Sequence, residues 1–263
     1  MAGTPTKMQS TIQLDAGARE RVPAILHLPE AAGPVPAALL LHGFTARKEE
    51  MSDSVGVALA RCGVASLALD LPVHGERMGG VEGMSLSDPL ALVRNWRLAL
   101  REAHEAIRYL AEHTKIDPFR VGIVGYSLGA YLSAFVAAVN RRVQAVALVC
   151  GGDLPAQTPF ASLVRTVADP RRAVRALAGR PLLMVNGLRD SLILPEQAQV
   201  LFEAASEPKE LRWYDGPHLP PNGVADEVAG WVVTRLAECP SAPFATPAEP
   251  ADSSQAPRLR RAS

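Results

Sequence analysis

The chain has 263 residues and balances 27 lysines and arginines against 27 aspartates and glutamates, so its formal net charge is zero. This length is enough for one large domain with a substantial core. The balanced charge excludes the electrostatic footprint expected of a protein that binds nucleic acid or an anionic membrane.

Targeting signals and cysteines narrow the class of protein further. Residues 1–10 lack the charged and apolar regions of a secretory signal, and no apolar run approaches the ~20 residues that cross a bilayer. Three widely spaced cysteines, Cys62, Cys150 and Cys239, fit neither a disulfide framework nor a metal site. We therefore expect a cytoplasmic protein without a metal or other cofactor, in a reducing compartment.

Strands alternate with helices along the chain. Residues 11–15 and 22–28 predict an antiparallel hairpin that turns at Ala16 and Gly17. Apolar runs predict the remaining strands, at residues 37–41, 64–69, 121–125, 143–149, 181–186 and 210–214. Helical periodicity predicts helices at residues 55–61, 89–113, from 128 onward, 169–178, 195–206 and 222–238.

This alternation predicts the α/β class, with a mostly parallel eight-stranded sheet and helices on both faces. Functional groups are expected at the carboxyl ends of its strands. One domain is expected over residues 1–238, in which residues 151–180 could form a small cap insert. The composition of residues 239–263, rich in Pro, Ala and Ser, predicts a disordered tail.

The stretch around Ser127 is the most informative part of the sequence. An apolar, β-branched run ends in Gly125, Ser127 follows, and Gly129 opens a helical pattern. This G-x-S-x-G spacing between a strand and a helix is typical of a nucleophile elbow. The glycines are expected where the two backbones approach too closely for a Cβ atom. The turn would lift the Ser127 hydroxyl above the sheet.

A serine nucleophile needs a base and a carboxylate. His218, which follows the last predicted strand, is expected to take the serine proton, and a carboxylate should hold its other ring nitrogen. Asp190 follows the strand over residues 181–186 and is the predicted carboxylate. Its competitors are Asp153, Asp215 and Asp226, of which the first is the strongest because it also follows a strand.

The developing oxyanion needs two N–H donors. Leu128, directly after the nucleophile, and Phe44, in the loop after the strand over residues 37–41, are the predicted oxyanion-hole residues. His42 is expected to fix that loop by hydrogen bonds.

Substrate-pocket candidates are His74, Glu76 and Tyr126. His74 and Asp70 are expected to pack and shape their loop, with substrate contact as the alternative. Glu76 and Arg77 could touch the substrate or form a solvated ion pair. Cys150 is expected to be a buried apolar residue.

The order Ser127, Asp190, His218 is typical of the α/β-hydrolase superfamily, which the chain resembles over roughly residues 11–237. Leu41-His42-Gly43-Phe44-Thr45, with Asp70 and the His74-Gly75-Glu76 turn, resembles serine esterases of the cinnamoyl-esterase and dienelactone-hydrolase-like branches. The resemblance implies hydrolysis of carboxylic esters through an acyl-enzyme, without a cofactor. Dienelactone hydrolases proper carry cysteine at the elbow, so Ser127 favours an esterase.

Two alternatives remain open at the level of sequence. The same three residues could serve a peptidase or a thioesterase, because they do not define the leaving group. A hydrolase fold can also be retained as a non-catalytic binding protein. The expected partner is a small-molecule ester, and the expected state is a monomer or a homodimer.

Overall fold

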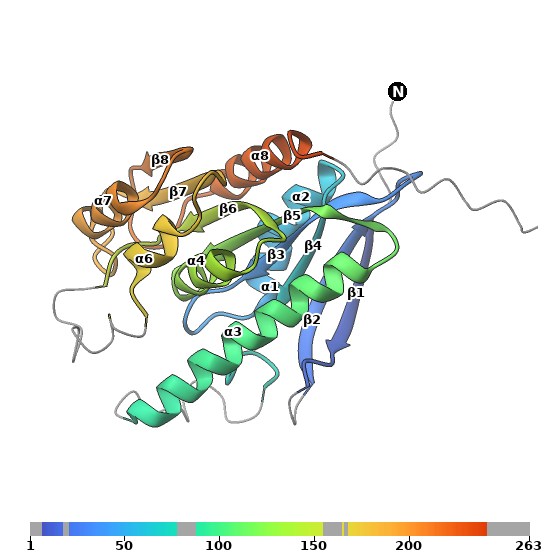
Figure 1. Ribbon diagram of the computed structural model, residues 1–263, viewed down its shortest axis with the longest axis horizontal. Coiled ribbons are helices and arrows are strands. Elements are labelled where there is room, and N and C mark those ends of the chain that lie inside the picture. Colours follow the sequence, from blue (N-terminus) through green and yellow to red (C-terminus); the bar gives the residue numbers. More distant parts are fainter. Residues whose placement is uncertain (1–6, 18–20, 78–87, 155–164, 166–167, 241–263) are drawn as a thin grey trace, which may run out of the picture.

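The computed structural model describes residues 7–17, 21–77, 88–154, 165 and 168–240. They form an eight-stranded sheet in the order β1-β2-β4-β3-β5-β6-β7-β8 (Figure 1). Its strands are β1 (Lys7–Leu14), β2 (Val22–Pro29), β3 (Val35–Leu41), β4 (Ala65–Leu69), β5 (Ile116–Tyr126), β6 (Val143–Val149), β7 (Leu182–Gly187) and β8 (Lys209–Tyr214). Pairing is antiparallel from β1 to β2 and from β2 to β4, and parallel between all other neighbours. The predicted α/β class, the opening hairpin and the mostly parallel sheet are confirmed.

Helices cover both faces of the sheet, as the alternation of elements predicts. One face carries α3 (Pro89–Glu112), α4 (Leu128–Val139), α6 (Pro170–Arg175) and α7 (Pro195–Ala204), which bury side chains in one core cluster. The other face carries α1 (Lys48–Met51), the π-helix η1 (Ser52–Gly56), α2 (Val57–Arg61) and α8 (Val224–Ala237), which bury side chains in a second cluster.

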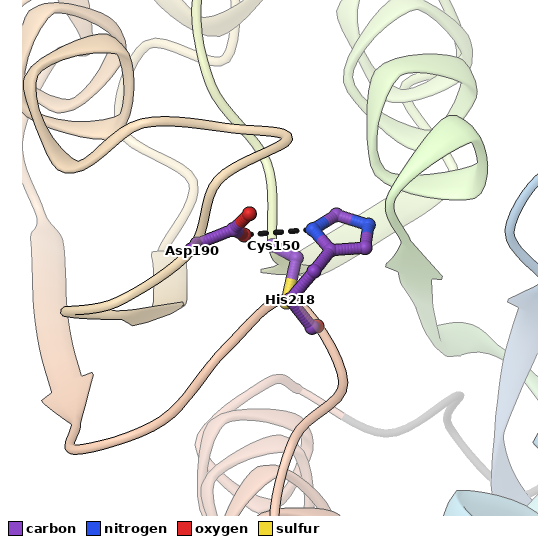
Figure 2. A group of neighbouring side chains, drawn as sticks. All are labelled: Cys150, Asp190 and His218. Carbon is purple, nitrogen blue, oxygen red and sulfur yellow. Dashed lines mark hydrogen bonds and ion pairs between the residues drawn. The ribbon is translucent and has the colours of Figure 1, made fainter.

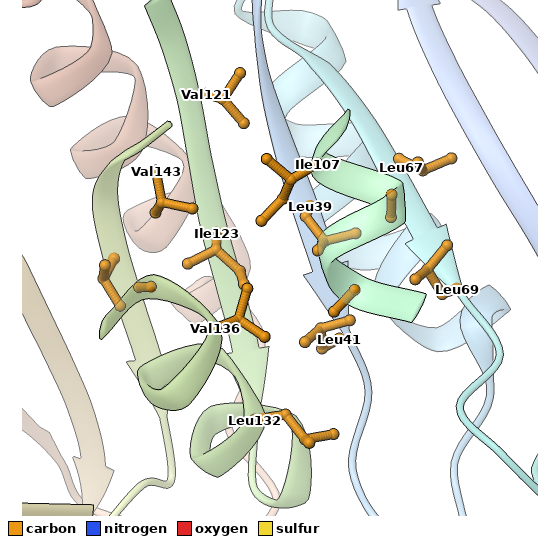
Figure 3. Packing of buried hydrophobic residues seen from close by; sticks show 14 of the residues in the cluster. Leu39, Leu41, Leu67, Leu69, Ile107, Val121, Ile123, Leu132, Val136 and Val143 are labelled. Carbon is orange, nitrogen blue, oxygen red and sulfur yellow. The ribbon is translucent and has the colours of Figure 1, made fainter. Parts of the chain in front are cut away.

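The central strands are apolar at consecutive positions because both of their faces are buried. Leu39 and Leu41 of β3 belong to the first cluster, together with Ile107 of α3 and Leu132 of α4 (Figure 3). Leu40, between them in sequence, belongs to the second cluster. Full burial of each such leucine contributes roughly 1.5–3 kcal/mol. The packing on both faces fixes the carboxyl ends of the strands relative to one another.

The first helical segment begins earlier than the helix predicted over residues 55–61, whose start the sequence places near Ser52 or Asp53. It begins at Lys48 and passes through the π-helical turn η1 before it ends at Arg61. The Lys48 N–H donates to Oδ1 of Asp70 at 2.9 Å, so a side chain that follows β4 caps the start of α1. This cap joins residues 22 positions apart, and sequence periodicity therefore does not reveal it.

The predicted insert over residues 151–180 is described in part. α6 packs against α4 and α7 and buries Ala173 and Val174 in the first cluster, so this helix belongs to the helical layer. Residues 155–164 and 166–167 of the insert, residues 78–87 and residues 241–263 of the predicted tail lie outside the described residues. The cap and the disordered tail remain predictions. Within the described parts of the chain, no helix has the length and apolar character that a membrane span requires.

Candidate active site

Ser127 lies at the turn between β5 and α4 with φ of 51° and ψ of −111°, a left-handed conformation that is uncommon outside glycine. A Cβ atom at Gly125 would lie 2.1 Å from the carbonyl oxygen of Gly129, and one at Gly129 would lie 2.1 Å from the carbonyl oxygen of Leu41. The expectation that this turn has no room for a side chain at either glycine is therefore confirmed. Close packing of β3, β5 and α4 holds the serine in its strained geometry.

A continuous chain of hydrogen bonds links Ser127, His218 and Asp190. His218 Nε2 lies 2.9 Å from Ser127 Oγ, and His218 Nδ1 lies 2.7 Å from Asp190 Oδ2. Figure 2 shows the Asp190 carboxylate directed at the imidazole ring. β7 and β8 are parallel neighbours, with Gly187 opposite Tyr214, so the two loops that carry Asp190 and His218 leave the same edge of the sheet.

Asp190 is fixed as an acceptor. Its side chain is buried, and Oδ1 accepts the N–H groups of Leu192 and Ile193 at 2.8 and 2.9 Å, which leaves Oδ2 for His218. Asp153, the strongest competitor, instead accepts two hydrogen bonds of 2.8 Å from Arg165. The other competitors are on the surface: Asp215 pairs with Arg189, and Asp226 pairs with Arg61.

The loop after β3 runs beside the serine. A Cβ atom at Gly43 would lie 2.8 Å from the ring of Tyr126 and 3.4 Å from Cβ of Ser127, so the backbone next to Phe44 closely approaches the nucleophile. The Phe44 side chain itself is 38% exposed. Leu128 is the first residue of α4, so its N–H has no acceptor within the helix and points from the helix N-terminus.

His42 ties this loop to the loop after β4. Its Nδ1 lies 2.7 Å from the Gly43 carbonyl oxygen and therefore donates, while Nε2 accepts the Leu71 N–H at 3.0 Å. Burial lowers the pKa of His42 from 6.5 to about 4, and the ring is neutral at physiological pH. The expected role of His42 in fixing the loop by hydrogen bonds agrees with these contacts.

Lys48 is a buried residue that sequence reasoning missed. Its side chain is 1% exposed, and Nζ lies 3.0 Å from Asp70, 2.5 Å from Glu76 and 2.9 Å from Glu49. Burial alone would lower the pKa of Lys48, but the three carboxylates outweigh this effect and raise it. The sequence shows Lys48 within a charged run, which normally indicates a solvated surface.

The turn that carries Asp70 and Glu76 is also tightly packed. Asp70 Oδ2 accepts the Glu76 N–H at 3.0 Å, and a Cβ atom at Gly75 would lie 2.1 Å from Asp70 Oδ1. The interpretation of Glu76 and Arg77 as a solvated ion pair is wrong. Arg77 is buried and binds Glu102 of α3 through two hydrogen bonds of 2.6 and 2.9 Å, while Glu76 binds Lys48. The two residues find separate partners because the turn directs them to different elements.

The remaining pocket candidates, His74 and Tyr126, contact different residues of the site. His74 is buried, its ring centroid lies 5.6 Å from that of Phe44, and its Nδ1 bonds to the Pro72 carbonyl oxygen at 2.7 Å. The Tyr126 ring lies 5.4 Å from the His218 ring and borders a cavity of about 490 Å³. Among the residues that line this cavity are His42, Met51, Tyr126, Val149, Leu219 and Pro221. A second hollow of about 720 Å³, near Phe119 and Val139, contains none of the predicted site residues.

Cys150 is buried, as expected, but it also contacts the site. Its Sγ lies 3.0 Å from the His218 carbonyl oxygen and 3.2 Å from the Tyr214 hydroxyl. Burial raises the pKa of this thiol to about 12. Ligand atoms of Cys150, Asp190 and His218 lie within 4.8 Å of one another (Figure 2). Spacing along the sequence does not predict this cluster, because its members come from three different strand ends.

The sheet order, the sharp strand–helix turn at Ser127 and the loops that gather at the carboxyl edge define the α/β-hydrolase fold. The sequence profile of the alpha/beta hydrolase family matches residues 38–261 of this chain. The chain therefore belongs to this family.

Individual relatives share only limited sequence identity with this chain. The chain is 32% identical over 111 residues to the polyketide transferase ATR5 of Stachybotrys chlorohalonatus, a match that covers 42% of this chain and only 34% of that protein. It is 26% identical over 196 residues to the esterase YjfP of Escherichia coli, which covers 66% of this chain and 76% of that protein. Among solved structures, TT1662 from Thermus thermophilus superposes with a TM-score of 0.72 at 23% identity, over 87% of this chain and 98% of that one.

Proposed function

We propose that this chain is a serine hydrolase that cleaves small to medium carboxylic esters through an acyl-enzyme intermediate. The hydrogen-bonded chain from Ser127 Oγ through His218 to Asp190 is the observation that carries this proposal. The similarity to a protein named an esterase supports the same reaction class.

The proposed reaction assigns one role to each residue. Ser127 Oγ attacks the ester carbonyl carbon while His218 Nε2 takes its proton, and the alcohol leaves with that proton. Water then attacks the acyl-enzyme by the same steps, and the acid is released. Asp190 keeps the imidazole in the tautomer with hydrogen on Nδ1 and stabilises the imidazolium.

The oxyanion that forms at the carbonyl is assigned to the N–H groups of Phe44 and Leu128. Each such donor is typically worth about 3–4 kcal/mol in the transition state. The left-handed conformation of Ser127 and the close approach of Gly43 support this assignment, because both bring backbone beside the nucleophile. His74 and Tyr126 border the same region and are proposed to contact the substrate.

A fluorophosphonate probe tests the nucleophile directly. We expect covalent labelling of the wild-type chain at Ser127 and none in the folded Ser127→Ala variant. A wild-type protein that stays unlabelled would contradict the proposal and favour a non-catalytic binding protein. Mass spectrometry of the labelled peptide locates the attached group.

A substrate panel tests the leaving group. Nitrophenyl esters of increasing chain length, a feruloyl ester, a thioester and an aminoacyl amide should be compared by kcat/KM. We expect the oxygen esters of short and medium acids to be the best substrates. A higher kcat/KM for the thioester or the amide would replace the esterase assignment with a thioesterase or a peptidase that uses the same residues.

A further inference from the structure

We propose that Cys150, Asp190 and His218 form a binding site for Zn²⁺ that inhibits the enzyme. The inference rests on the proposed function, because the site shares Asp190 and His218 with the catalytic machinery. One ligand atom from each residue lies within 4.8 Å of the others. Figure 2 shows the three side chains gathered at this point. A thiolate, an imidazole nitrogen and a carboxylate oxygen are the three ligand types that Zn²⁺ takes in proteins. A tetrahedral ion would keep its fourth position for water.

The ligands are held in place by the fold. Cys150 ends β6 in a left-handed conformation with φ of 54°, and its N–H donates to the Val185 carbonyl oxygen at 2.8 Å. Asp190 Oδ1 is occupied by two backbone N–H groups, so Oδ2 is the oxygen that faces the cluster. The His218 carbonyl oxygen accepts from the hydroxyl of Tyr126 at 3.2 Å. Three strand ends therefore present sulfur, oxygen and nitrogen together.

Nδ1 is the nitrogen of His218 that such an ion would bind, because it lies 2.7 Å from Asp190 Oδ2. In the metal-free site Nδ1 carries the hydrogen and the lone pair of Nε2 faces Ser127 Oγ. An ion on Nδ1 displaces the hydrogen from that nitrogen and binds the Nδ1 lone pair, so the neutral ring then carries its hydrogen on Nε2. Nε2 then is a donor and cannot accept the serine proton, so the base is lost while the ring stays in place.

The proton balance of this step is simple. The thiol of Cys150 releases its proton to solvent and binds as thiolate. The imidazole loses the proton on Nδ1 and gains one on Nε2, so its charge does not change. One proton is released for each ion bound. No bond of the serine is formed or broken, so removal of the ion restores the base and the inhibition is reversible.

Zinc titration of ester hydrolysis tests the site in the full chain. Zn²⁺ should inhibit the wild type, EDTA should restore its rate, and Mg²⁺, which prefers oxygen ligands, should have no effect at equal concentration. For Cys150→Ser we expect the half-inhibitory zinc concentration to rise by more than about tenfold. Inhibition of each variant is measured against its own metal-free rate. The expected size follows because even residues that only contact the ligands of a metal site are worth about 10–100-fold in metal affinity.

Cys62→Ser is the matched control, because Cys62 is exposed and distant in sequence from the cluster. It should be inhibited like the wild type. If Cys150→Ser does not fold, Cys150→Ala serves the same purpose. Equal inhibition of the Cys150 variants and the wild type would overturn the proposal and place any zinc effect elsewhere.

A spectroscopic measurement separates this proposal from the proposed hydrolase function. Co²⁺ bound by a thiolate gives a charge-transfer band in the near ultraviolet, and this band does not require turnover. We expect the band in the Ser127→Ala variant and in Cys62→Ser, and its loss in Cys150→Ser. A band that persists in Cys150→Ser, or is absent from Ser127→Ala, would refute the metal site. A chain that hydrolyses no ester but shows the expected bands would refute only the proposed function.

Discussion

Oδ2 of Asp190 lies 2.7 Å from Nδ1 of His218, although the two residues are 28 positions apart in the chain. The contact exists because β7 and β8 are parallel neighbours and their following loops leave the same edge of the sheet. Since Oδ1 of Asp190 is held by the backbone, the carboxylate reaches the ring in one orientation.

Asp190→Asn should lower kcat for ester hydrolysis by about 10³–10⁴-fold, because the amide no longer holds the productive tautomer of His218. Asp215→Asn is the matched control. Asp215 precedes His218 by three residues and is exposed, with Arg189 as its partner, so its change should stay below about tenfold. Asp153→Asn should behave like the control because Arg165 holds that carboxylate. If kcat collapses in Asp153→Asn and survives in Asp190→Asn, the assignment of the acid is wrong.

Lys48 is predicted to position the loop after β3 through its contacts with Asp70 and Glu76. Lys48→Met leaves the Asp70 carboxylate buried without its cation, and we expect a loss of about 3 kcal/mol in the free energy of unfolding. The loop carries the Phe44 N–H, which is proposed to bind only the developing oxyanion, so kcat should fall by about tenfold while KM changes little.

Urea unfolding and steady-state kinetics measure both effects of Lys48→Met. Arg47→Met is the control, since the neighbouring Arg47 side chain is 67% exposed and its change should alter neither quantity appreciably. The double variant Lys48→Met with Asp70→Asn removes the unpaired charge and should recover part of the stability. A rise in KM at constant kcat would speak against a role in the oxyanion loop.

His42 makes stability depend on pH. Burial lowers its pKa from 6.5 to about 4, so the unfolded chain binds a proton at His42 between these values and the folded chain does not. The free energy of unfolding should therefore fall as the pH drops from about 6.5 to about 4, by about 3 kcal/mol from this residue. Denaturant unfolding of the wild type and His42→Asn at pH 7 and at pH 4.5 isolates the effect. The prediction fails if both proteins lose the same stability over this interval.

Two glycines provide a matched test of the elbow. Gly129→Ala places a Cβ atom 2.1 Å from the Leu41 carbonyl oxygen, so the β3 backbone must move. We expect a loss of more than about 2 kcal/mol in the free energy of unfolding, or no folded protein. Gly230→Ala lies in α8, where the new Cβ meets no atom within 4 Å beyond the adjacent backbone of its own helix, and it should raise stability by about 0.5–1 kcal/mol. Thermal or urea unfolding of the two variants makes the comparison, and similar values would contradict the proposed steric limit.

The sequence by itself determined the fold class, the strand order along the chain and the place of the elbow. Local patterns carry this information: consecutive apolar residues in strands buried on both faces, and a serine between two glycines where a strand meets a helix. The residues predicted to act together, Ser127, Asp190 and His218, follow from the position of each after a predicted strand.

Only the tertiary structure decided which side chains meet across the sheet edge. In the folded chain Asp153 pairs with Arg165, Arg77 with Glu102 and Lys48 with Asp70. The Cys150 thiol contacts the His218 backbone. These partners are far apart in sequence, and local periodicity contains no information on them. The start of α1 shows the same limit, because its cap is the Asp70 carboxylate from the loop after β4. The sequence does not distinguish a charged side chain that is solvated from one that is buried. The packing of elements that are distant in the chain determines whether that side chain is buried.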